Sequence, residues 1–283
     1  MREHTVQCIG PHGLHRMAYT EWGDAKNPRV LLCVHGLTRC GRDFDFLAQS
    51  LADHYRVVCP DVVGRGQSEW LTVKDDYQIP QYVADMVTLI ARLDVASVHW
   101  LGTSMGGLIG MGLAAQLNTP IVRLVLNDVG PLINAASLKR IAQYVGQAPK
   151  FASIDEAESY VRAVSASFGQ FTDAQWRHLT LHITRVAADG GVELAYDPGI
   201  AVPFSKSVDG KDIDLWPLYE AIHCPTLLVR GAESDLLSHD TALAMTRRGP
   251  RATLLEIPGV GHAPMFMDDE QVAPVRDFLL RDG

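Results

Sequence analysis

The chain contains 283 residues, of which 47% are apolar and 20% are charged, and this length suffices for one large hydrophobic core with an inserted lid. Its formal net charge of −8 disfavours nucleic acid as a partner. No uncharged apolar stretch reaches the roughly 18 residues that a membrane span requires. The first ten residues lack the basic start and the apolar run of a signal peptide. We therefore expect a globular protein that binds a small molecule, with no nucleic-acid and no membrane partner.

The cysteines indicate the redox environment of the protein. There are five, an odd number, and no two of them form a CxxC pair. This pattern predicts free, largely buried thiols in a reducing compartment, and so a cytoplasmic location. It suggests neither a zinc site nor a redox pair. The sequence predicts no metal site and implies no cofactor.

The first strand-like elements are residues 5–9 and 14–22, separated by Gly-Pro-His-Gly, and they read as an antiparallel hairpin at one edge of a sheet. Short apolar runs rich in Val and Leu then follow, and runs that are apolar on both faces are typical of a parallel sheet covered on both sides. They alternate with helical patterns. The sequence predicts an α/β fold in which helices cover both faces of a mostly parallel, eight-stranded sheet. The six apolar runs are residues 29–34, 55–60, 96–102, 121–127, 225–231 and 252–258.

One helical pattern, residues 81–93, carries apolar residues at helical spacing. We expect its buried face to contain Val83, Val87, Ile90 and Ala91.

The alternation of strands and helices stops after Pro131 and resumes at Pro225. The intervening sequence is helical in pattern and more polar. We expect residues 1–131 and 217–283 to form the core, and residues 132–216 to form a helical cap or lid inserted between its two halves.

A serine lies between glycines at residues 102–106, with the sequence Gly-Thr-Ser-Met-Gly. The pattern G-x-S-x-G is weak alone, but here it follows an apolar strand and leads into a helix-like run. A strand–serine–helix turn forces the serine into a strained backbone with its hydroxyl exposed, and the glycines remove side chains that would collide there. The turn also directs the first N–H groups of the helix at whatever is bound to the serine. Ser104 is therefore a candidate nucleophile in a nucleophile elbow.

With these features the sequence resembles the α/β-hydrolase family over nearly its whole length. His35-Gly36 stands at the end of a strand, where family members carry His-Gly. The resemblance implies that the backbone N–H groups of Leu37 and Met105 form the oxyanion hole.

The resemblance also implies a triad in the chain order Ser, acid, His. His262, on a Gly-rich loop after the last strand-like run, matches the position of the family's base. Asp235 follows the penultimate strand, where the family's acid normally lies, and is the preferred acid. Asp128 follows the strand before the insertion, where some members place the acid, and Glu233 is a remote third.

The expected function is hydrolysis of carboxylic esters with small or medium apolar acyl groups, through an acyl-enzyme on Ser104. Epoxide hydrolases and haloalkane dehalogenases resemble one another in using Asp at the nucleophile position, so Ser104 disfavours both. Two alternatives stay open. One is a carbon–carbon bond hydrolase or an enol-lactonase of aromatic catabolism, and the other is a non-enzymatic small-molecule receptor on the same fold.

Arg39 directly follows the oxyanion turn and should face the mouth of the pocket. It is a candidate for binding a substrate carboxylate. The alternative is a structural pair with Asp43 or Asp45.

Overall fold

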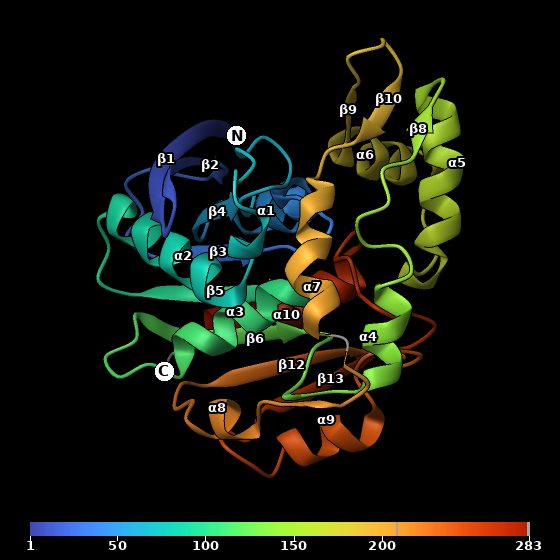
Figure 1. Ribbon diagram of the computed structural model, residues 1–283. Coiled ribbons are helices and arrows are strands. Elements are labelled where there is room, and N and C mark those ends of the chain that lie inside the picture. The colour runs from blue at the N-terminus through green and yellow to red at the C-terminus, as the bar shows by residue number, and fades with distance from the viewer. Residues whose placement is uncertain (208, 282–283) are drawn as a thin grey trace.

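A computed structural model describes residues 1–207 and 209–281 of the chain (Figure 1). Eight strands form one sheet in the order β1-β2-β4-β3-β5-β6-β12-β13. The pairs β1–β2 and β2–β4 are antiparallel, and all other neighbours are parallel. The predicted mostly parallel sheet of eight strands with a hairpin at one edge is confirmed. The strands are β1 (Arg2–Gly10), β2 (Gly13–Trp22), β3 (Val30–Val34), β4 (Arg56–Pro60), β5 (Val98–Thr103), β6 (Ile121–Asn127), β12 (Thr226–Gly231) and β13 (Thr253–Ile257).

Helices cover both faces of this sheet, and the side chains of β3 show why its sequence is apolar throughout. Val30, Leu32 and Val34 pack into one core, whereas Leu31 and Cys33 pack into the other. Because successive side chains of a strand point to opposite faces, a strand covered on both sides has no polar positions. The first core is covered by α2 (Ile79–Leu93), α3 (Met105–Ala114), α8 (Trp216–Glu220) and α9 (His239–Met245), and the second by α1 (Asp45–Leu51) and α10 (Asp269–Leu280).

The predicted buried face of α2 is wrong at Val87, which is 49% exposed, and at Ala91, which is also exposed. Met86 and Leu89 are buried instead. The buried stripe also contains a charged residue, Asp85, whose carboxylate forms a 3.1 Å hydrogen bond with His15 of β2. A partnered carboxylate inside the stripe breaks the apolar pattern from which the face was predicted.

The chain from β7 to β11 forms an insertion that stands at one side of the sheet, whereas α8 lies apart from it (Figure 1). Its short strands β8, β10 and β9 form a separate sheet, and β7 pairs with β11, so that the two ends of the insertion lie side by side. The sequence pattern indicated only helices here. The elements are β7 (Leu132–Ile133), α4 (Ala135–Ile141), β8 (Lys150–Phe151), α5 (Ile154–Val164), α6 (Asp173–Ile183), β9 (Thr184–Val186), β10 (Val192–Leu194), α7 (Ala201–Ser207) and β11 (Ile213–Asp214).

Four short 3₁₀ helices complete the described structure: η1 (Gly41–Phe44), η2 (Lys74–Asp76), η3 (Ala166–Phe168) and η4 (Pro198–Ile200). Positions 208, 282 and 283, which belong to the predicted cap and core ranges, lie outside the described residues. Within those residues, no helix is both long enough and apolar enough to cross a membrane.

The cysteines among these residues are all free thiols. Four of them, Cys8, Cys33, Cys40 and Cys59, are buried, and Cys224 is half-buried.

Candidate active site

The carboxyl ends of the parallel strands bring three polar side chains together. Ser104 follows β5, Asp128 follows β6, and His262 lies on the loop after β13. In a parallel sheet these ends meet at one edge, and ligands bind in the crevice outside them. The site therefore arises from strand order and not from closeness in sequence.

Ser104 occupies a strained turn between β5 and α3, with φ 51° and ψ −113°. This is a region that residues with a side chain rarely adopt. The glycines beside it make the turn possible. A Cβ atom on Gly102 would lie 2.2 Å from the carbonyl oxygen of Gly106, and one on Gly106 would lie 2.0 Å from that of Val34. The predicted strand–serine–helix geometry is present, and it requires glycine at both positions.

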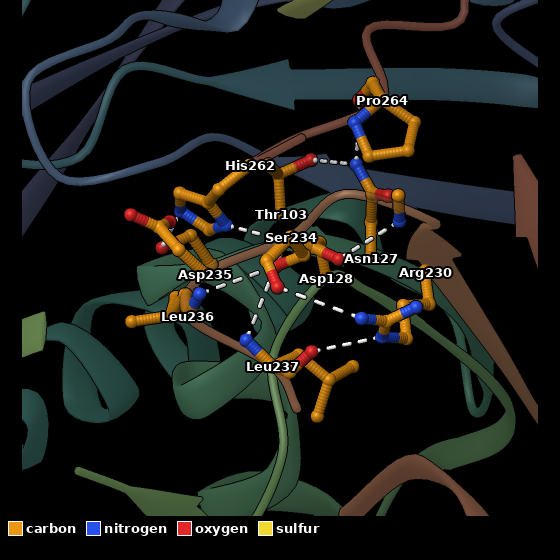
Figure 2. Close-up of polar contacts among 12 residues, drawn as sticks. Thr103, Asn127, Asp128, Arg230, Ser234, Asp235, Leu236, Leu237, His262 and Pro264 are labelled. Carbon is orange, nitrogen blue, oxygen red and sulfur yellow. Dashed lines mark hydrogen bonds and ion pairs between the residues drawn. The ribbon is translucent and has the colours of Figure 1, made fainter. Parts of the chain in front are cut away.

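His262 connects Ser104 to a buried carboxylate. Its Nε2 atom lies 3.0 Å from Ser104 Oγ. Its Nδ1 atom lies 2.7 Å from Asp128 Oδ2, and Figure 2 draws His262 and Asp128. Because a carboxylate only accepts hydrogen bonds, Nδ1 carries the hydrogen and Nε2 presents its lone pair to the serine hydroxyl. This is the tautomer that a general base next to a serine requires.

Asp128 is held rigidly by other hydrogen bonds. Its side chain is fully buried, and its Oδ1 atom accepts the N–H of Gly231 at 2.9 Å. Its Oδ2 atom also accepts the hydroxyl of Ser234 at 2.6 Å, and Figure 2 shows this serine between Asp128 and the backbone of the 234–237 loop. The backbone N–H groups of Leu236 and Leu237 in turn donate to the Ser234 hydroxyl. The buried carboxylate therefore has several partners and a fixed orientation.

The structure does not bring Asp235 to His262, so the preferred acid of the sequence prediction is wrong. The side chain of Asp235 is 57% exposed, and its Oδ1 atom accepts a 2.9 Å hydrogen bond from Arg140 of α4. The preceding residue, Ser234, is the one that turns toward Asp128. The second choice, Asp128, takes the place next to His262. Ser234 was missed, because no sequence signal links a serine in this loop to an aspartate after β6.

The predicted oxyanion loop packs directly against the nucleophile turn. A Cβ atom on Gly36 would lie 3.8 Å from Ser104 Cβ, and the N–H of Gly106 donates to the carbonyl of His35. Among the described residues, the N–H groups of Leu37 and Met105 donate to no protein acceptor. Both residues line the cavity at Ser104. They stand where the resemblance assigned the oxyanion donors.

His35 supports this loop from beneath. It is fully buried, its Nε2 atom accepts the N–H of Val62 at 2.9 Å, and its Nδ1 atom donates to the carbonyl of Gly36 at 2.7 Å. Burial lowers the pKa of His35 to about 3, and the positive charges of Arg65 and Arg39 add to this effect. The imidazole is therefore neutral at physiological pH.

A cavity of about 980 Å³ lies above Ser104. Core residues form its floor, and the insertion contributes apolar side chains to its wall, among them Leu138, Ile141 and Phe204. The size and the largely apolar wall are typical of a site for a small organic molecule.

Arg39 lines the same cavity and is also paired with Asp43 of η1. Its Nε and Nη2 atoms donate to the two carboxylate oxygens at 2.8 and 2.6 Å. Its guanidinium carbon lies 5.7 Å from the centre of the Phe168 ring. Burial lowers the pKa of Arg39, but the charge and hydrogen bonds of Asp43 outweigh this effect and raise it. Of the two predicted partners, Asp43 is the one observed.

Two groups of side chains have the composition of a metal site. Cys8, His15 and Asp85 gather where the β1–β2 hairpin meets α2, and all three are buried. Burial, with the charge of Asp85, raises the pKa of the Cys8 thiol to about 12. The thiolate that a metal ion requires is therefore disfavoured.

The second group consists of Asp45, His178 and His182, between α1 and α6. Arg42 already donates to both carboxylate oxygens of Asp45. Burial, with the charges of Arg42 and His178, lowers the pKa of His182 to about 4. A metal ion here would have to compete with the guanidinium for Asp45.

Comparison with known proteins identifies the family. The sequence profile of the alpha/beta hydrolase fold matches residues 29–269 of this chain. The chain belongs to the α/β-hydrolase family. The resemblance read from the serine turn and the His-Gly strand end is confirmed, and this α/β hydrolase is an enzyme.

Individual α/β hydrolases are similar to it over nearly their whole length. The 3-hydroxybutyrate-oligomer hydrolase of Cupriavidus necator is 53% identical over 281 residues, which cover 97% of this chain and 96% of the relative. A putative hydrolase from Rickettsia typhi has a TM-score of 0.93 at 32% identity, with 100% of both chains covered. An α/β hydrolase from Novosphingobium aromaticivorans has a TM-score of 0.87 at 35% identity and covers 98% of this chain and 97% of its own.

Proposed function

We propose that this α/β hydrolase cleaves carboxylic esters through an acyl-enzyme on Ser104, with His262 as the base and Asp128 as the acid that orients it. The observation that carries the proposal is the hydrogen-bonded series from Ser104 Oγ through the imidazole to the Asp128 carboxylate, at 3.0 and 2.7 Å. A serine, a base and an orienting carboxylate in this geometry activate the hydroxyl for attack on an acyl carbon.

In the first half of the reaction, Ser104 Oγ attacks the ester carbonyl and His262 Nε2 takes the hydroxyl proton. The carbonyl oxygen gains negative charge and accepts hydrogen bonds from the N–H groups of Leu37 and Met105. One such donor contributes roughly 3–4 kcal/mol to lowering the barrier. The bond to the alcohol oxygen then breaks, and that oxygen takes the proton from His262.

In the second half, water attacks the acyl group on Ser104, and His262 accepts one proton of this water. The bond to Ser104 Oγ breaks, the serine recovers its proton from His262, and a carboxylic acid leaves. Asp128 stabilises the positive imidazole in both halves without taking its proton.

For the substrate, we propose short oligomers of 3-hydroxybutyrate or closely similar hydroxy-acid esters. The similarity to the Cupriavidus necator enzyme, 53% over 281 residues, supports this class. The cavity supports it too, because about 980 Å³ with a largely apolar wall suits a short aliphatic ester chain. In this proposal residues 132–216 act as a cap, since Leu138, Ile141 and Phe204 cover the cavity.

We also propose a cytoplasmic location, because the free thiols described above suit a reducing compartment.

The test is hydrolysis of a 3-hydroxybutyrate trimer and of aryl esters of increasing acyl length, with wild type beside Ser104→Ala. We expect wild type to cleave the trimer and one range of aryl esters, and the variant to lose about 10⁵- to 10⁶-fold in kcat. Equal rates for both proteins would overturn the role of Ser104. Tight binding of the trimer by wild type without cleavage would favour the receptor alternative.

A further inference from the structure

One basic side chain in the cavity wall has hydrogen-bond donors that the protein does not use. Asp43 occupies the Nε and Nη2 atoms of Arg39, whereas Nη1 donates to no group among the described residues. The cavity is lined by two further basic side chains, Arg140 and Lys206, which pair with Asp235 and Asp75.

Exposure separates Arg39 from these two. The side chains of Arg140 and Lys206 are 43% and 66% exposed, but that of Arg39 is only 10% exposed. Arg39 is therefore the shielded cation of the cavity. A guanidinium that is held on one edge and open on the other is suited to bind an anion, and a carboxylate matches its geometry.

Arg39 lies next to the nucleophile. A Cβ atom placed on Gly36 would contact both the Arg39 side chain, at 3.7 Å from Cγ, and Ser104, at 3.8 Å from Cβ. The aliphatic part of the Arg39 side chain and Ser104 therefore lie on either side of Gly36. Both side chains also line the same cavity, so a substrate held at Ser104 occupies the space that Arg39 borders.

Arg39 and the His262 loop are connected by η3. Ser167 Oγ donates to the carbonyl of His262 at 3.2 Å, and the ring of the next residue, Phe168, packs against the Arg39 guanidinium. η3 therefore contacts both the His262 loop and the Arg39 side chain. His262 gives its proton to the alcohol oxygen that leaves, and His262, η3 residues and Arg39 line the same cavity, so a leaving group at His262 shares this space with Arg39.

We infer that Arg39 binds the free carboxylate of a leaving hydroxy acid, so that the enzyme cleaves oligomers at their carboxyl end and releases one hydroxy acid per cycle. This inference rests on the proposed function. In a 3-hydroxy acid, only two carbon atoms separate the alcohol oxygen from the carboxylate carbon. The leaving oxygen can therefore face His262 while the carboxylate faces Arg39.

The chemistry of each cycle balances without a co-reactant other than water. The bond between the acyl carbon and the 3-oxygen of the terminal unit breaks, and that oxygen takes the proton from His262. The released 3-hydroxy acid keeps the carboxylate that Arg39 bound. Water then frees the shortened oligomer from Ser104, and the carboxylate formed in this step becomes the next group for Arg39 to bind.

The first test compares a 3-hydroxybutyrate trimer that has a free carboxylate with the same trimer capped as its methyl ester. Wild type should prefer the free acid by about 10- to 100-fold in kcat/KM, as expected for a charge-assisted hydrogen bond to the substrate. The carboxyl-terminal unit of the free trimer is labelled. The early products should then be a labelled monomer, which carries the original carboxyl end, and an unlabelled dimer. Equal kcat/KM for both trimers would overturn the inference but leave the ester hydrolase intact. Cleavage of neither trimer would overturn both.

The second test uses variants. Arg39→Met should reduce the ratio of the two kcat/KM values toward one, mainly through KM for the free acid. Arg140→Met should keep the wild-type ratio. If Arg39→Met does not fold without the pair to Asp43, Arg39→Lys is used instead. Arg39→Lys should also lower the ratio, because a lysine cannot bind the carboxylates of Asp43 and of the substrate in the same geometry. An unchanged ratio in a folded Arg39 variant would overturn the inference.

Discussion

Asp128 holds the imidazole of His262 through a 2.7 Å hydrogen bond. Asp128 is the residue after β6, whereas Asp235, in the loop after β12, does not contact this imidazole. The two aspartates lie on neighbouring strand ends but differ in surroundings. Asp128 is fully buried, whereas Asp235 faces solvent and pairs with Arg140. This difference gives the two residues separate experimental signatures.

The clearest prediction concerns these two acids. Asp128→Asn should lower kcat by about 10⁴-fold, because an amide cannot hold the required tautomer of His262. Asp235→Asn is the matched control and should stay within a few-fold of wild type, since it removes only an exposed ion pair. Steady-state kinetics on an aryl ester measure both. A large loss in Asp235→Asn together with a small one in Asp128→Asn would contradict the assignment.

Ser234 should affect catalysis although it does not contact the nucleophile. Ser234→Ala leaves the buried Asp128 carboxylate without one of its hydrogen bonds, so we expect kcat to fall by about 10-fold and the free energy of unfolding to fall by about 1–3 kcal/mol. Ser137→Ala is the control, because Ser137 is also buried and bonds to the same loop, through the carbonyl of Asp235. It should lose stability while its kcat stays near that of wild type. Equal kcat losses in both variants would mean that the loop as a whole, and not the bond to Asp128, is responsible.

We expect the effect of a glycine substitution on stability and activity to depend strongly on its position relative to the turn at Ser104. Gly106→Ala places a Cβ atom 2.0 Å from a backbone oxygen, so it should cost about 3 kcal/mol or more and abolish activity by displacing the turn. Gly112→Ala lies in the same helical run, where the Cβ atom meets only a side-chain methyl at 3.4 Å. There we expect a neutral effect or a gain of up to about 1 kcal/mol. Urea unfolding of both variants checks this contrast, which a similar loss in the two would refute.

His35 predicts a loss of stability in mild acid. Its pKa of about 3 in the folded protein lies below the ordinary value of 6.5, so between these values the unfolded chain binds one more proton than the folded one. Stability is fully present above about pH 6.5 and falls with decreasing pH, by up to ~1.4 kcal/mol per pH unit for this group. Urea unfolding at pH 7, 6 and 5 measures the slope. His35→Gln should be less stable at pH 7 but show a shallower slope, and an unchanged slope would exclude His35 as its source.

The fold was predictable from the sequence because strands such as β3 are apolar on both faces, a pattern that parallel packing requires. The buried face of α2 was not predictable, because the buried Asp85 is stabilised by His15, a residue 70 positions away in the chain. Hydrophobic periodicity contains no information about such a partner.

In the candidate active site, the sequence analysis singled out Ser104 and His262, which the structure brings together, but it preferred Asp235 to Asp128, and Asp128 is the one that contacts His262. Both aspartates follow strands that end at the same edge, so position along the chain does not separate them. The deciding quantity is side-chain direction. Asp128 has a positive φ of 52°, whereas in the β12 loop it is Ser234 that faces inward. Residue type alone does not specify such local geometry.

The pairing of β7 with β11 has a consequence for how this enzyme can diverge. Ile133 and Ile213 are direct partners in that pairing, so the chain leaves the core and returns to it at the same place. We therefore expect the strand ends that carry Ser104, Asp128 and His262 to keep their spacing when the length of the chain between these two residues changes. We also expect an exchange of the chain between Ile133 and Ile213 to change the cavity wall while Ser104, Asp128 and His262 are kept.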